Sequence, residues 1–215
     1  MKVEKSHIFI IILVLAAVAF SYGEIDPVAA QNTFPDLVHY RDMASYSPGL
    51  PHNVEQPFIY WILGPYIAGL LPFSTPMDFK VLELASAAVL LILFYLYLCR
   101  LNIESSTSLL VAIFLLCNKF FMGVMLYNYF QVNDTLGLIF ILLMFWSLQE
   151  RKWTIFGTAL FLGAMTRESS LIMIPTSLFY LLEKRILRES FLRYLFSLLP
   201  AQASDLQTDT LINLC

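Results

Sequence analysis

An aspartate and a tyrosine four residues apart carry the first candidate chemistry of this sequence. Asp36 and Tyr40 lie in the polar segment 36–44, and on a helix such a pair shares one face. A carboxylate at a water–lipid boundary can act as a general base that removes a proton from an attacking hydroxyl or amine. The structural alternative is an acid in the first turn of a helix that begins at Pro35, beside Arg41.

Further charged residues interrupt or border the apolar parts of the chain. Asp134 opens an apolar run, and Arg167 and Glu168 interrupt another at 154–182. Charge at membrane depth is costly and is usually functional or paired, and a guanidinium can hold a phosphate through two hydrogen bonds. The alternatives are a helix cap for Asp134 and an ion pair for Arg167 and Glu168. Asn133 also opens an Asn-x-Thr glycosylation acceptor.

Composition indicates an integral membrane protein. The chain has 215 residues, of which 59% are hydrophobic and 13% charged, against about 25% charged in soluble domains. Its mean hydropathy is +0.71. The net charge of −3 and the absence of a basic patch argue against a nucleic-acid partner. The three histidines lack metal-ligand spacing; a divalent metal is not indicated, and the sequence leaves open whether one or another cofactor is needed. Cys99 and Cys117 fall in apolar runs and are expected to be free, buried thiols.

The apolar residues cluster in runs that predict an all-α, polytopic transmembrane helix bundle of about six spans. A spanning helix needs about 20 apolar residues, so the last two runs are short for a span. The first run, with Lys2 and Lys5 before it, also fits a cleaved signal peptide. The runs are 8–22, 81–99, 108–127, 134–148, 154–166 and 169–182.

Basic residues orient this predicted bundle with its N-terminus in the cytoplasm. With alternating spans, only Arg41, Lys80 and Arg167 fall outside, and basic residues next to spans resist translocation. In a prokaryote the bundle would lie in the plasma membrane, among membrane lipids. The basic residues that fall on the cytoplasmic side are Lys2, Lys5, Arg100, Arg151, Lys152, Lys184, Arg185, Arg188 and Arg193.

The predicted outer loop, about 23–80, contains a second apolar stretch at 57–72 that is rich in aromatic residues. Pro65 would kink a helix there, and Trp61 suits the lipid headgroup zone. We expect interfacial helices in this loop, and the alternative is a seventh span. The transmembrane domain is predicted over 1–200 and a polar tail over 201–215.

The order of these motifs resembles membrane glycosyltransferases with the C-type fold, such as protein O-mannosyltransferases and lipid A aminoarabinose transferases. Residues 36–44 resemble their D-x-x-x-Y-x-x-x-A signature, residues 56–63 their proline-led juxtamembrane helix, and residues 162–168 a Gly…Thr-Lys element. Leu37 stands where many relatives carry a second acid, and Arg167 stands where they have lysine. Since these families continue through further spans, the resemblance implies an N-terminal or truncated portion.

The resemblance implies transfer of a sugar from a polyprenyl-phosphate donor to an acceptor at the outer membrane–water interface. Asp36 would be the base, and Arg167 would meet the donor phosphate. Substrate contacts would also involve Tyr40, Arg41, Asp134 and Glu168. Two other functions stay open: a non-catalytic protein on the same scaffold, and a small transporter. Transport is disfavoured because the acidic residues gather at one predicted face of the membrane. Only Asn118 and Lys119 lie deep enough within a predicted span to line a path.

Overall fold

The computed structural model describes residues 4–26, 35–49 and 58–182, and in these ranges every regular element is helical. The chain divides into two compact units, residues 1–173 and 174–215. Of the second unit only 174–182 is described, and it is helical. The predicted polar tail at 201–215 lies outside the described residues.

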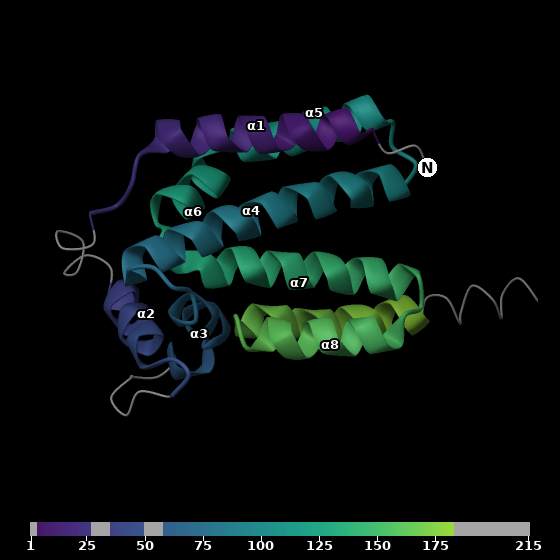
Figure 1. Ribbon diagram of the computed structural model, residues 1–215. Coiled ribbons are helices and arrows are strands. Elements are labelled where there is room, and N and C mark those ends of the chain that lie inside the picture. Colours follow the sequence, from purple (N-terminus) through teal and green to yellow (C-terminus); the bar gives the residue numbers. More distant parts are fainter. Residues whose placement is uncertain (1–3, 27–34, 50–57, 183–215) are drawn as a thin grey trace, which may run out of the picture. The chain divides into compact units, whose positions relative to one another are not determined.

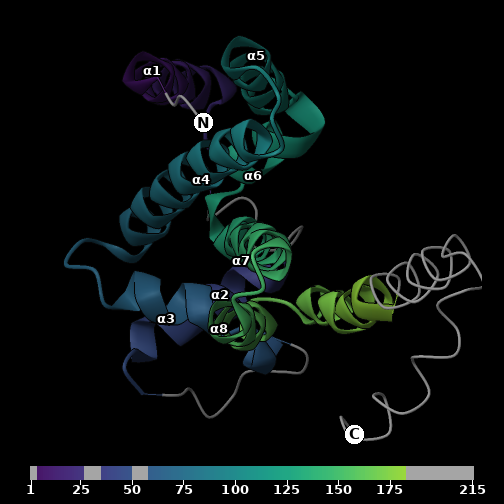
Figure 2. The same ribbon diagram turned by 90° about the vertical axis from the view of Figure 1, so that its right-hand side faces the viewer.

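The long helices of the first unit are α1 (Lys5–Tyr22), α4 (Thr75–Arg100) and α7 (Val132–Gln149). They lie in successive layers, with α4 in the middle, as Figures 1 and 2 show. Ser74 precedes α4, and Pro76 occupies its first turn, where the missing N–H is not needed. Gly23 follows α1 with a φ of 75°, a left-handed conformation that glycine adopts without strain.

Three helices are long and apolar enough to cross a membrane: Lys5–Tyr22, Thr75–Arg100 and Tyr129–Gln149. A fourth candidate is the bent pair Ser105–Leu116 and Lys119–Tyr127, whose parts meet at 47°. This is the architecture of an integral membrane protein. The all-helical prediction is confirmed for the described residues, whereas the prediction of about six spans is confirmed only for three or four. The two short predicted spans form apolar helices at Trp153–Ala164 and Glu168–Leu182.

The predicted third span is broken at Asn118. Helix α5 (Ser105–Leu116) ends there, and a π-helical turn, Lys119–Gly123, leads into α6 (Val124–Tyr127). The Asn118 side chain accepts a hydrogen bond from the Phe120 N–H at 3.0 Å and so caps the second part. An uninterrupted apolar run therefore does not give a straight helix here.

The outer-loop stretch forms a 3-10 turn, Phe58–Tyr60, and a short helix α3 (Leu63–Gly69). Seven residues cannot cross a bilayer, which excludes the seventh span within this described segment. Pro65 lies in the first turn of α3 and does not kink it, so that prediction is wrong. Trp61 is only 8% exposed, so most of its ring packs inside the protein.

Helix α2 (Pro35–Tyr46) packs against α3, and both lie at the end of the bundle where α4 and α7 begin (Figure 1). Gly69 allows this packing, since a Cβ there would collide with the Ala44 carbonyl oxygen and the Ser47 Cβ. Helix α8 (Trp153–Ala164) packs along α7 and returns the chain to the same end. Cys99 and Cys117 are free thiols; Cys99 is buried, as expected, whereas Cys117 is exposed.

Candidate functional site

Four segments of the first unit bring polar side chains together at the end of the bundle that holds α2 and α3. They are the start of α2, the segment before α3, the start of α7, and the turn after α8, which leads into a 3-10 helix, Glu168–Ile172. We call the residues that they contribute the arginine–carboxylate cluster. It consists of Asp36, Tyr40, Trp61, Asn133, Asp134, Arg167 and Glu168.

Arg167 is held between a carboxylate and an indole ring. Its guanidinium pairs with Asp134, and its Cζ lies 4.8 Å from the centroid of the Trp61 ring. The Trp61 Nε1–H donates in turn to the Glu168 carboxylate. The side chains of Arg167 and Asp134 are 31% and 25% exposed, so the pair is shielded but reachable from outside. Arg167 therefore does form an ion pair, but its partner is Asp134, and Glu168 forms none with a described residue.

Asn133 fixes the segment that carries Trp61. Its Nδ2 donates to the Trp61 carbonyl at 2.8 Å, and its Oδ1 accepts from the Gly64 N–H at 2.9 Å. A Cβ on Gly64 would lie 2.5 Å from that Oδ1, so the contact requires glycine. Asn133 is 1% exposed, which leaves no accessible amide for glycosylation in the folded chain. Since Asn133 precedes Asp134, the same turn of α7 sets the position of both partners of Arg167.

Asp134 lies in the first turn of α7 and is not its N-cap, which is Gln131. The helix-cap interpretation is therefore wrong. A 3-10 turn, Tyr129–Gln131, leads directly into α7 and starts that helix before Asp134 is reached. The acid remains well placed next to the positive end of the helix dipole.

Tyr40 is a fully buried member of the cluster. Its ring meets Phe58 edge-on with 6.1 Å between centroids, and its hydroxyl makes no hydrogen bond that satisfies normal geometry with any described residue. Burial is the main cause that raises the pKa of Tyr40 far above its ordinary value. The Asn133 amide and the Arg167 charge act in the opposite direction but do not outweigh it. Tyr40 is therefore a neutral phenol and not a proton acceptor.

Asp36 occupies the first turn of α2 and is half-buried. It interacts electrostatically with Tyr40 and with Asp134, and Asp134 interacts with both Asp36 and Arg167. The predicted proximity of Asp36 to Arg167 at one end of the bundle agrees with this arrangement. No described residue forms an ion pair with Asp36.

A cavity of about 290 Å³ opens beside the Asp134–Arg167 pair. One polar patch, formed by this pair and Ser169, faces apolar walls from α6, α7 and the π-helical turn. Such a space can take a polar group attached to an apolar chain. No metal-ligating group of three or more side chains occurs within the described part of the chain. The lining residues are Phe121, Met125, Asp134, Gly137, Leu138, Ile141, Arg167 and Ser169.

The structure does not join every predicted site residue to the cluster. Arg41 is half-buried on α2 and forms no ion pair with another residue that the structure describes. His39 stacks on Phe58, with 4.5 Å between ring centroids. The sequence reasoning missed Trp61 and Asn133 as parts of the site, because their roles depend on contacts between distant segments. It also missed Glu83, whose charge within an apolar run was a usable signal.

Comparisons with protein-family models, with curated proteins and with solved structures found no match to this chain. The function is therefore argued from the residues and their geometry.

Proposed function

We propose that this chain is a membrane-embedded glycosyltransferase that moves a sugar from a polyprenyl-phosphate-linked donor to an acceptor at the outer membrane–water interface. The observation that carries the proposal is the Asp134–Arg167 pair, which lines an open cavity at one end of an apolar helix bundle and lies close enough to Asp36 for Asp134 and Asp36 to interact electrostatically. A base and a cation at a lipid–water boundary are the two groups that this reaction needs.

In the proposed reaction Asp36 takes the proton from the acceptor O–H or N–H as that atom attacks the anomeric carbon of the donor. The bond between this carbon and the phosphate oxygen breaks, and polyprenyl phosphate leaves with the electron pair. Arg167 stabilises the charge that develops on the leaving phosphate. The prenyl chain lies against the apolar residues of the cavity, such as Phe121 and Leu138.

The donor phosphate must compete with Asp134 for the guanidinium. Only the Nε of Arg167 is assigned to the pair with Asp134, and a guanidinium has five N–H donors. The terminal nitrogens can therefore face the cavity while the pair and the Trp61 contact hold the orientation of the group. In this scheme Asp134 is a positioning residue for Arg167.

The proposal includes the predicted topology of about six spans with a cytoplasmic N-terminus. Trp153–Ala164 and Glu168–Leu182 would then cross as short spans, with local thinning of the bilayer. Asp36, Asp134 and Arg167 would all face the outer side of the plasma membrane, where polyprenyl-phosphate sugars serve as donors without soluble nucleotides.

The experiment compares Asp36→Asn with Asp42→Asn, since Asp42 is exposed on the same helix. Each purified variant is placed in liposomes with a panel of polyprenyl-phosphate hexoses and pentoses, and release of polyprenyl phosphate is measured. We expect Asp36→Asn to abolish turnover while melting temperature and donor binding stay unchanged, and Asp42→Asn to retain activity. Full activity in Asp36→Asn would show that Asp36 is not the base.

A second function, a non-catalytic membrane protein on this scaffold, is favoured by one observation. Arg167 already has an ion pair and a ring contact, and Glu168 already accepts from Trp61, so much of the cluster is satisfied without a ligand. Donor affinity without turnover in the unmodified protein would support this function over catalysis.

A further inference from the structure

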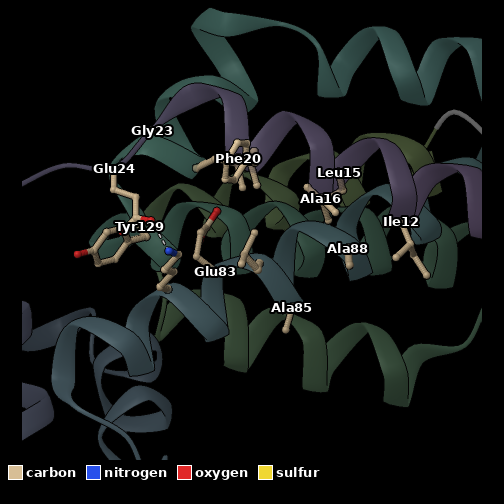
Figure 3. A pocket seen from close by; sticks show the side chains of 14 residues that line it. Ile12, Leu15, Ala16, Phe20, Gly23, Glu24, Glu83, Ala85, Ala88 and Tyr129 are labelled. Atoms are coloured by element: carbon tan, nitrogen blue, oxygen red, sulfur yellow. Dashed lines mark hydrogen bonds and ion pairs between the residues drawn. The ribbon is translucent and has the colours of Figure 1, made fainter.

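A second cavity is larger than the one beside Arg167. It has a volume of about 580 Å³ and lies between α1 and α4. Figure 3 shows that its walls are mainly small and apolar side chains from these two helices. It is lined by Ile12, Leu15, Ala16, Ala19, Phe20, Gly23, Glu24, Lys80, Glu83, Leu84, Ala85, Ala88, Leu126 and Tyr129.

Glu83 gives this apolar cavity a buried carboxyl group. The residue is 1% exposed, and its Oε1 accepts a hydrogen bond from the Thr135 hydroxyl at 2.7 Å. Its Oε2 is buried and has no partner among the described residues. Figure 3 shows the side chain pointing from α4 toward α1, into the space between them. A buried carboxyl oxygen without a donor is costly, so a donor from a ligand would be strongly favoured.

The charges around the cavity select the kind of donor. At one end Glu24 pairs with Lys80, so the only cation in the lining is already neutralised. The lining therefore offers no unpaired cation to a carboxylate or a phosphate, whereas the carboxyl group of Glu83 can form an ion pair with an amine. The alanines of the lining leave room for an unbranched hydrocarbon chain along α1 and α4.

We propose that this cavity binds an amphiphile with a protonated amine headgroup, whose ammonium donates to Glu83 and whose hydrocarbon chain lies between α1 and α4. The site contains none of the residues of the arginine–carboxylate cluster. The proposal therefore does not depend on glycosyl transfer, and either can fail without the other.

The test is photolabelling of the purified full chain, in detergent micelles, with a dodecylamine that carries a diazirine near the end of its chain. We expect covalent label on peptides that contain residues 12–20 and 84–88. Dodecylamine should compete at a concentration at least about tenfold below that of dodecanol or dodecanoate, because hydrogen bonds to charged groups are worth about 1.5–3 kcal/mol. Equal competition by the carboxylate would overturn the proposal.

Two variants with a matched control complete the test. Glu83→Gln keeps an acceptor for Thr135 but removes the charge, and it should raise the competing amine concentration about tenfold. Ala16→Trp fills the cavity and should abolish labelling, whereas Ala17→Trp, which is exposed and outside the lining, should retain it. Melting temperatures confirm that each variant is folded. An unchanged amine response in Glu83→Gln, or equal loss of label in the two tryptophan variants, would overturn the proposal.

Discussion

Replacing Arg167 with methionine tests the geometry of the candidate site without any substrate. The change removes the ion pair with Asp134 and the contact with the Trp61 ring, while most of the side-chain volume stays. A ring contact at 4.8 Å in a partly shielded position is worth about 1 kcal/mol. The side chains of Arg167 and Asp134 are 31% and 25% exposed. The free energy lost with this ion pair therefore lies between the values for surface and buried pairs, at about 1.5–2 kcal/mol.

We therefore expect Arg167→Met to lower the free energy of unfolding by about 2.5–3 kcal/mol. For a chain of this size that corresponds to a fall in melting temperature of roughly 5–12 °C. The assay is thermal unfolding in a mild detergent, followed by far-UV circular dichroism. Lys119→Met is the control, because Lys119 is exposed and distant from the cluster in sequence; it should change stability by less than about 0.5 kcal/mol.

A double-mutant cycle with Asp134→Asn isolates the pair. Asp134→Asn alone should cost about 1 kcal/mol or less, because it also removes the repulsion between Asp134 and Asp36. The double variant should be more stable than the sum of the single changes predicts, with a coupling of at least about 1 kcal/mol. Additivity within about 0.5 kcal/mol would refute the reasoning, since it would mean that the two side chains do not depend on each other.

Two further predictions concern single groups. Tyr40→Phe removes a buried hydroxyl without a well-formed hydrogen bond, so the free energy of unfolding should stay constant or rise by up to about 1 kcal/mol in the same melts; a clear loss would contradict this. The pKa of Glu150 is lowered, first by the hydrogen bond from Lys152 and then by the one from Trp146, so its carboxylate stabilises the fold above its ordinary pKa of 4.5. This contribution is lost as the pH falls through the lower folded pKa. Glu150→Gln should therefore lower the melting temperature more at about pH 7 than at about pH 3, and an equal difference at both pH values would argue against it.

The helical framework could be predicted because long runs of hydrophobic residues mark membrane-spanning helices. The runs at 8–22, 81–99 and 134–148 became α1, α4 and α7 with small shifts at their ends. The expectation that Asp36 and Arg167 lie at the same end of the bundle came from the alternation of helix directions. After an even number of passes the chain returns to the end from which it started. Pattern and charge together were sufficient for these features.

The internal details of the site depended on contacts that no local pattern encodes. Trp61 looked like a headgroup anchor because aromatic residues near apolar stretches usually are, but it is buried under Arg167. Asn133 matches a glycosylation acceptor in the sequence, but in the structure its amide is hydrogen-bonded to the backbone of Trp61 and Gly64. The break at Asn118 lies within an unbroken apolar run, where a side-chain cap starts a new helix.

The charge balance of the cluster decides what Arg167 can do. With Asp36, Asp134 and Glu168 ionised, one guanidinium is surrounded by three carboxylates, so the net charge does not attract a phosphate. Binding of an anionic donor must then rely on the directed N–H groups of Arg167 and on the apolar cavity. The Asp134→Asn variant of the cycle separates the two functions through donor binding. If Arg167 meets the donor phosphate, removing the competing carboxylate strengthens binding while stability falls. If the cluster is only structural, the variant loses stability and gains no affinity.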